Sequence, residues 1–229
     1  MALEESKYYE SYDKFYLSVD CIVFALYEGS LKLLLINRKF EPHKGEWSLM
    51  GGFVEHGESV DDAARRVLRD LTGLDGIYMH QIGTFGEIDR DPGERVISVA
   101  YSALLNFPDL DHDMLKEHNA FWVDFKDVPE LICDHNAMIE KAISKMQHKM
   151  RVEPLAFQLL PEHFTLTQLQ QLYETLLGYT IDKRNFRRRA LENKCIVATE
   201  MMDKESSRRG ARLYVYKPND MKEAESFKI

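Results

Sequence analysis

The spacing of apolar residues changes several times along the chain, and each change marks a secondary-structure element that we expect. Runs rich in β-branched and aromatic residues, bounded by Gly, Pro, Asp or Asn, are typical of strands. We expect strands over residues 15–26, 31–40, 77–88, 95–105 and 121–125. Glu28, Gly29 and Ser30 separate the first two strands and predict a β-hairpin. A helical pattern from about residue 137 to 150 follows the last strand.

Another helical pattern lies between these strands, in the segment GGFVEHGESVDDAARRVLRDLTGL of residues 51–74. Ser59 with Asp62 has capping-box spacing, and Gly73 is expected to end the helix. Apolar residues recur every three or four positions and predict one buried face, made of Val60, Ala63, Ala64, Val67, Leu68 and Leu71. Strands on both sides of this helix, with a terminal helix, predict an α/β sandwich.

A second unit is expected after residues 151–161, where two prolines interrupt the helical pattern. Thr165 with Gln168 has capping-box spacing at the start of a helix that Gly178 ends. Asp182 can cap a second helix. That second helix is expected over residues 183–191, and strands are expected over 195–201 and 211–216. A helix, a turn, a basic helix and two strands predict a winged helix-turn-helix domain.

Composition limits the classes of protein to which the chain can belong. Its 229 residues allow one large or two unequal domains. No run of about 18 apolar residues occurs, so no membrane span is expected, and the acidic N-terminus is unlike a signal peptide. Three cysteines without paired spacing indicate buried free thiols in a reducing, cytoplasmic environment: Cys21, Cys133 and Cys195.

Charge is distributed unevenly along the chain, whose net charge is −8. Residues 1–150 hold 16 Lys and Arg against 27 Asp and Glu, whereas residues 151–229 hold 14 against 11. Five of these 14 basic residues lie within residues 181–190, in the second helix of the C-terminal unit. A solvated helix face is the common explanation of such a run, but its place in a capped helix pair favours DNA binding, with Phe186, Ala190 and Leu191 turned inward. The expected DNA contacts are Thr167, Lys183, Arg184, Asn185, Arg187, Arg188, Arg208 and Arg209.

The loop between the strands expected at 77–88 and 95–105 is dense in charge. Asp-Pro and Pro-Gly are turn formers, so a polar hairpin loop is one interpretation. The other is a ligand pocket, because alternating acids and arginines can bind sugar hydroxyls or nucleotide phosphates. The candidate effector-binding residues are Trp47, Phe85, Asp89, Arg90, Asp91, Glu94 and Arg95.

The segment of residues 51–74 resembles the Nudix box, a family pattern that places catalytic glutamates on a helix after a glycine loop. The matching positions are Gly52, Glu58, Arg66, Leu68, Gly73 and Leu74. The three positions at which the family carries its catalytic glutamates hold Val67, Asp70 and Leu71. The resemblance therefore implies the frame of a phosphate-ester hydrolase from which most catalytic carboxylates are missing.

These replacements change the expected chemistry. Val67 and Leu71 can neither bind a metal nor act as a general base, so we expect no catalytic residue, no metal and no cofactor. Asp62, Arg66 and Asp70 have i,i+4 spacing, which indicates salt bridges on a solvated face. A hydrolase of ADP-ribose or a related nucleoside diphosphate derivative is the alternative, supported by Glu58, Arg66 and Asp70.

With FTLTQLQQLYETLLGYTIDKRNFRRR near its end, the chain resembles the NrtR-like family of Nudix-related transcriptional regulators, and WSLMGGFV and RDPGERV are similar to its arabinose-responsive AraR branch. The resemblance implies an α+β fold, with a Nudix-like α/β/α sandwich over residues 1–150 for effector binding and dimerisation, and a winged helix-turn-helix domain over 151–229. It also implies a homodimeric repressor on a palindromic double-stranded DNA operator. The implied effector is a small molecule, either a sugar such as L-arabinose or ADP-ribose. An interaction domain whose basic helix binds an acidic protein is a third interpretation.

Overall fold

The computed structural model describes residues 9–27, 29–39, 41–73, 76–106, 112–152, 155–204 and 210–218. Within these ranges, one sheet holds β1 (Tyr16–Tyr27), β2 (Ser30–Asn37), β3 (Trp47–Ser48), β4 (Met50–Phe53), β5 (His80–Phe85), β6 (Val96–Asn106) and β7 (Ala120–Asp124). The helices are α2 (Val60–Thr72), α3 (His112–Glu117), α4 (His135–Val152), α5 (Leu166–Leu177) and α6 (Lys183–Glu192), with 3₁₀ turns η2 (Phe125–Asp127) and η3 (Leu155–Gln158). A separate hairpin consists of β8 (Ile196–Asp203) and β9 (Ala211–Tyr216). Across the described residues, no helix has the length and apolar character needed to cross a membrane.

β1 is the centre of the sheet because both of its edges are paired. On one edge it runs parallel to β6, with Tyr16 opposite Val96. On the other edge its first half pairs with β4 and its second half with β2, both antiparallel. The β1–β2 hairpin closes with Tyr27 opposite Ser30, in agreement with the hairpin that the sequence predicts.

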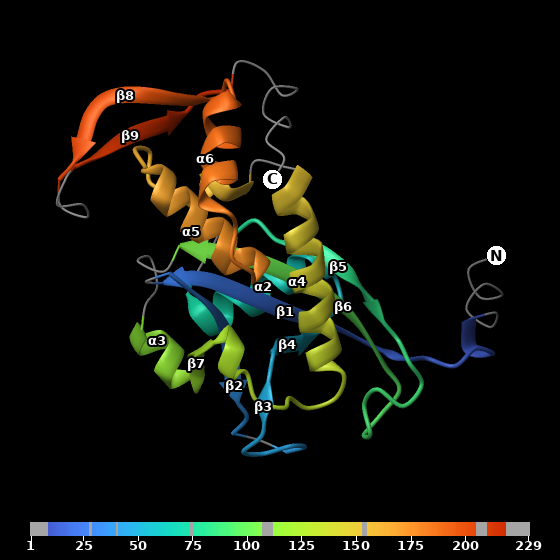
Figure 1. Cartoon of the computed structure of the whole chain (residues 1–229). Coiled ribbons are helices and arrows are strands. Elements are labelled where there is room, and N and C mark those ends of the chain that lie inside the picture. Colours follow the sequence, from blue (N-terminus) through green and yellow to red (C-terminus); the bar gives the residue numbers. More distant parts are fainter. Residues whose placement is uncertain are drawn as a thin grey trace.

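Alternate residues of β1 point to opposite faces of the sheet, and a different helix covers each face. Val19, Cys21 and Val23 belong to a hydrophobic cluster with the apolar side of α2. Ile22 and Phe24 belong to a second cluster that includes α4. In Figure 1 α4 and α2 lie on opposite sides of the sheet, which confirms the predicted α/β/α sandwich.

The C-terminal elements have the predicted order of a winged helix-turn-helix domain. α5 and α6 pack through Tyr173 and Phe186, whose ring centroids are 5.9 Å apart. β8 and β9 pair antiparallel, and the hairpin extends away from the sheet in Figure 1 (orange to red). Tyr214 of β9 exchanges backbone hydrogen bonds with Phe164, just before α5, which ties the wing to the helices.

One hydrophobic core is continuous from the sheet into the winged-helix domain. Met146 and Met150, in the second half of α4, belong to the same cluster as Leu172 of α5. A polar contact reinforces this packing, since Thr175 Oγ1 of α5 donates to the Gly29 carbonyl in the β1–β2 turn at 2.9 Å. The two domains are therefore packed against each other rather than joined by a loose linker.

Three expectations from the sequence differ from the structure. α4 begins at His135 rather than near 137, because the Met138 amide already bonds to the Asp134 carbonyl. The strand expected over 77–88 is limited to β5, whose pairing with β6 shifts register between Gln81 and Gly83. The expectation that all three thiols are buried is wrong for Cys133, which is exposed at the turn before α4.

Candidate functional site

The glycine-flanked helix α2 begins and ends at the residues that its sequence predicts. Ser59 Oγ accepts a hydrogen bond from the Asp62 amide at 3.1 Å, which satisfies a free N–H at the helix start. Gly73 adopts the left-handed conformation, with φ of 71°, and its amide bonds back to Arg69. These caps fix the position of the helix face that follows the glycine loop.

Two of the three positions at which the Nudix family carries catalytic glutamates are packed as apolar residues. Val67 is 4% exposed and lies so close to β4 that a Cβ added to Gly52 would be 2.8 Å from its Cγ2. Leu71 packs beside the same cluster and also lines the cavity described below. Asp70 is exposed, with its carboxylate 3.5 Å from Arg69 Nε. In the part of the chain that the structure describes, no group of three or more His, Cys, Asp or Glu could hold a metal ion.

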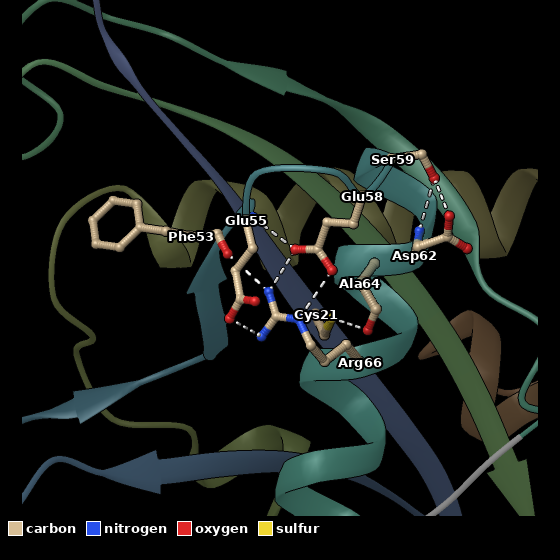
Figure 2. A network of polar contacts seen from close by, with 8 residues as sticks. All are labelled: Cys21, Phe53, Glu55, Glu58, Ser59, Asp62, Ala64 and Arg66. Atoms are coloured by element: carbon tan, nitrogen blue, oxygen red, sulfur yellow. Dashed lines mark hydrogen bonds and ion pairs between the residues drawn. The ribbon is translucent and has the colours of Figure 1, made fainter.

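Arg66 is the centre of a polar network between the start of α2 and the end of β4 (Figure 2). Its Nε and Nη2 atoms bond to the two carboxylate oxygens of Glu58 at 3.0 and 2.7 Å. Nη2 also donates to the Phe53 carbonyl at 2.9 Å, and Nη1 lies 3.6 Å from Glu55. Glu58, the glutamate retained from the Nudix pattern, therefore holds the loop to the helix.

The i,i+4 salt bridges expected among Asp62, Arg66 and Asp70 are wrong in their partners. Arg66 binds Glu58 instead, because a bidentate arginine–carboxylate pair is stronger than a single exposed contact. Asp62 binds Arg65 at 2.8 Å and accepts from Ser59 at 2.7 Å. Arg66 pairs with Glu58 because the loop before α2 folds back onto the helix. The spacing of residues along the helix does not predict this contact.

We expect the Glu58–Arg66 pair to weaken in acid. Hydrogen bonds from Arg66 and from the Glu55 amide lower the pKa of Glu58 from 4.5 to about 2. Since the folded-state pKa is the lower one, the stabilisation is complete above 4.5, decreases as the pH falls below that value, and is lost below about 2. Urea unfolding should therefore show Glu58→Gln less stable than wild type at neutral pH, with the difference shrinking in acid. Glu94→Gln, at an exposed position outside the network, is the control, and a pH-independent difference for Glu58→Gln would contradict the assignment.

A cavity of about 560 Å³ opens between the sheet, the segment after β2 and the start of α4. Its volume lies within the range of roughly 300–1,000 Å³ that is usual for small-molecule sites. Polar and charged lining residues include Ser18, Asp20, Arg38, Lys39, His43, Arg90, Asp91, Glu117, His118, Cys133 and His135. Phe53, Leu71 and Ile132 are among its apolar lining residues. This cavity is the candidate effector site.

Buried polar side chains form one wall of the cavity. Asp20 points to the same sheet face as Ile22, and its Oδ2 accepts from Ser98 Oγ at 2.5 Å. Arg90 makes a bidentate pair with Asp134 at 2.7 and 3.0 Å, and its Nη2 lies 3.7 Å from Asp20 Oδ2. His135 Nε2 lies 3.6 Å from Asp20 Oδ1. Burial lowers the pKa of His135, with the Asp20 charge opposing this effect, so the imidazole is neutral at pH 7.

The charged loop that the sequence singles out reaches the cavity in part. Arg90 and Asp91 line it. Arg95 instead donates to the carbonyls of Gly86 and Glu87, which closes the loop on itself. The two remaining charged candidates are exposed and are not among the lining residues: Asp89 and Glu94. Ligand binding by these residues stays a prediction.

The two aromatic candidates are packed in the fold and are not among the lining residues either. Trp47 lies edge-to-face on Phe121, with centroids 5.7 Å apart. Phe85 lies beneath the Lys141 ammonium, which is 4.9 Å from its ring centroid. Both rings also pack against the main hydrophobic cluster, so their structural role accounts for their aromatic character.

Sequence reasoning missed Asp20 and His135 on the cavity wall. Asp20 is an acid within an otherwise apolar strand pattern, FYLSVDCIVFAL, and this irregularity is a usable signal. His135 follows Cys133 and Asp134 at a helix start and has no comparable signal in sequence. Only the pairing of distant segments brings them together, as the Asp20–Ser98 contact shows.

The basic helix α6 is held firmly against α5. Asp182 caps it by accepting from the Asn185 amide at 2.8 Å. Glu174 of α5 accepts from the Ile181 amide at 2.8 Å and from Gln170 at 3.0 Å, which fixes the turn between the helices. The candidate DNA contacts on these two helices are all exposed: Thr167, Lys183, Arg184, Asn185, Arg187 and Arg188.

The inner face of α6 is smaller than expected. Phe186 and Ala190 are buried, at 1% and 0% exposure, but Leu191 is 58% exposed, so its expected inward position is wrong. Leu191 follows Ala190 by about 100° around the helix, which turns it away from the face that Phe186 and Ala190 share. The two wing arginines expected to contact DNA, Arg208 and Arg209, lie outside the described residues.

Comparisons with known proteins match both parts of the chain. Residues 17–142 match the family model of the NUDIX domain, and residues 156–216 match that of the NrtR DNA-binding winged helix domain. The chain is 34% identical over 208 residues to the ADPR responsive transcriptional repressor NtrR of Acinetobacter baylyi, covering 89% of this chain and 83% of the relative.

Solved structures give the same result. The crystal structure of Shewanella oneidensis NrtR complexed with a 27mer DNA has a TM-score of 0.75 and 30% identity, and the match covers 93% of this chain and 97% of that chain. The NUDIX domain of the same Shewanella protein, cocrystallised with ADP ribose, has a TM-score of 0.51 and 28% identity, covering 62% of this chain and 97% of that one.

The fold and the two domain matches thus define a Nudix-domain protein with a C-terminal DNA-binding winged helix. The chain belongs to the NrtR family of Nudix-related transcriptional regulators. Neither the family models nor these relatives identify the arabinose-responsive branch that its sequence resembles.

Proposed function

We propose that this chain is a transcriptional repressor that binds a palindromic operator as a homodimer and whose operator affinity is set by ADP-ribose. The observation that carries the proposal is the position of the cavity at one end of α4, whose other end packs on the DNA-binding domain. His135, the first residue of α4, lines the cavity. Gln147 Nε2, near the other end, lies 3.4 and 3.3 Å from the carbonyls of Leu176 and Leu177 at the end of α5.

Because α4 contacts both the cavity and α5, we assign a separate function to each part of the chain. Residues 1–150 would form the sensing and dimerising part and residues 151–229 the DNA-binding part, with 151–161 as the joint. A ligand that displaces the start of α4 would move Gln147 relative to α5, and α5 holds the turn before the basic helix. A ligand can change DNA affinity only if it interacts differently with the two arrangements.

ADP-ribose is favoured over a free sugar for two reasons. The NUDIX domain of the Shewanella relative was cocrystallised with ADP ribose, and the cavity is larger than a single pentose would fill. Arg38 and Lys39 also add positive charge to the lining, which suits a diphosphate. L-arabinose, implied by the sequence resemblance, gains no support from the relatives and serves as the comparison ligand.

We infer that the ligand is bound without being hydrolysed. Nudix-type hydrolysis would need carboxylates to hold Mg²⁺ beside the phosphates. Val67 and Leu71 supply none, and Glu58 is already bonded to Arg66. Asp70 alone, exposed beside Arg69, is a poor remainder of a metal site.

The basic helix is proposed to enter the major groove. Arg184 and Arg188 are i,i+4 neighbours on the side opposite Phe186 and Ala190, and both are exposed. Arginine recognises guanine edges and asparagine recognises adenine edges, so Asn185 is a further base-reading candidate. Thr167, Lys183 and Arg187 would position the helix on the backbone, together with the wing.

A titration of operator DNA with and without effector tests this function. An operator obtained by selection from random duplexes is bound by the full-length protein, and ADP-ribose with Mg²⁺ is then added. We expect operator affinity to change by roughly 5–150-fold, ADP-ribose affinity to change by the same factor when operator is present, and the nucleotide to be recovered intact. L-arabinose is added in a parallel series. Operator affinity that stays flat at saturating ADP-ribose would rule out this effector, and turnover near roughly 10 per second would identify a hydrolase.

A further inference from the structure

The polar wall of the cavity contains buried ionisable side chains that the stability of the fold does not explain. The side chains of Asp20, Arg90 and His135 are 8%, 4% and 7% exposed. Burying charged groups costs free energy even when they are paired, and apolar residues of similar size often replace such pairs without loss of stability. Arg90 is already neutralised by its bidentate pair with Asp134, so Asp20 is not needed to balance it. A role in ligand recognition explains why Asp20 faces a cavity.

One hydrogen-bond donor and one acceptor lie close together on this wall. The Leu49 amide donates to His135 Nδ1 at 3.2 Å, so Nδ1 is the acceptor of the ring and the proton is assigned to Nε2. Nε2 and Asp20 Oδ1 are 3.6 Å apart, which exceeds the roughly 2.7–3.2 Å of a hydrogen bond. A hydroxyl group placed beside both atoms can accept from Nε2–H and donate to Oδ1.

The backbone fixes this carboxylate in place. A Cβ added to Gly51 would be 2.3 Å from Asp20 Oδ1, so the carboxylate lies directly against the glycine strand β4. Ser98 on β6 holds the second oxygen at 2.5 Å. Both partners come from strands adjacent to β1, which makes the acceptor preorganised rather than free to swing.

We propose that Asp20 and His135 form a recognition site for the hydroxyl groups of a pentose ring. This inference rests on the proposed effector function and names the part of the ligand bound at this wall. A phosphate does not fit there, because the Asp20 carboxylate repels it, whereas neutral hydroxyls both donate and accept. The pentose is the terminal ribose of ADP-ribose or a free sugar, and the phosphates of the former lie toward Arg38 and Lys39.

Paired ligands and paired variants test the site. Calorimetry on the full-length protein compares ADP-ribose with ADP, which lacks the terminal ribose, and L-arabinose with D-ribose. Asp20→Asn keeps the shape of the side chain and removes the carboxylate. His135→Asn retains an acceptor near the Leu49 amide and removes Nε2–H, and it serves if Asp20→Asn fails to fold. Asp70→Asn, at an exposed acid that is not among the lining residues, is the matched control.

Wild-type protein and Asp70→Asn should bind ADP-ribose more tightly than ADP. Asp20→Asn and His135→Asn should lose about ten- to hundredfold in ADP-ribose affinity, with ADP affinity nearly unchanged, so that the preference disappears. If wild type binds a free pentose instead and the variants lose it, the recognition site stands and ADP-ribose as effector is overturned. If the variants keep the full preference, the site is wrong while the proposed function stands. If wild type binds none of these ligands, both are overturned.

Discussion

Replacing Arg184, Arg187 and Arg188 together with alanine is expected to reduce operator binding to the level of unrelated DNA. All three side chains are exposed on α6, and α6 is fixed by its cap at Asp182 and by its packing on α5. A base-reading arginine contributes about 1–3 kcal/mol, and a phosphate contact contributes a salt-dependent term that is independent of sequence. Their combined loss is comparable to the factor of roughly 10³–10⁷ that separates specific from non-specific binding.

Single variants separate the two kinds of contact. Arg184→Ala and Arg188→Ala should relax sequence preference at one base pair each, because these residues lie farthest from the buried face of α6. The measurement is a titration of specific and scrambled duplexes at several salt concentrations. Arg65→Ala, at an exposed arginine on α2, is the control. Unchanged operator affinity in the folded triple variant would show that α6 is not the reading helix.

Phe186→Ala is expected to lower the free energy of unfolding by about 3–5 kcal/mol. Phe186 is 1% exposed and packs against Tyr173, and it belongs to the cluster that continues into α4 and the sheet. Removing its ring leaves a cavity that the fixed caps of α5 and α6 prevent from closing. Chemical denaturation followed by far-UV circular dichroism measures the loss.

Leu191→Ala provides a control on the same helix. Because Leu191 is 58% exposed, this change should alter stability by no more than about 0.5 kcal/mol. Equal losses for the two variants would mean that Leu191 is buried, for example by a second subunit. The comparison of the two variants therefore also tests whether Leu191 is exposed to solvent in solution or is covered by a second subunit.

Local signals in the sequence predict the helices of this fold well. Ser59, Thr165 and Asp182 each cap the helix that their position predicts, and Gly73 and Gly178 end two of these helices in the left-handed conformation. Such signals depend only on residues a few positions apart. The same is true of the β1–β2 hairpin.

The cavity could not be predicted in this way because its wall depends on pairing between distant segments. The parallel pairing of β1 with β6 brings Ser98 to Asp20, and the turn before α4 then brings His135 to the same place. The charged loop is unusual in composition, yet only Arg90 and Asp91 of its candidate residues line the cavity. In this chain, the single acid in an apolar strand, Asp20, is a better indicator of the cavity than the number of charged residues in the loop.

The continuous core between the two domains limits how the protein could respond to the proposed effector. A flexible tether would let the DNA-binding domain pivot gradually, but here any new orientation must repack Met146, Met150 and Leu172 together. Densely packed interfaces have discrete stable arrangements rather than a continuum. Each molecule should therefore occupy one arrangement or the other. At an intermediate effector concentration, some molecules have one domain orientation and the rest have the other. Raising the concentration then changes the proportion of the two populations, and no molecule adopts an intermediate domain orientation.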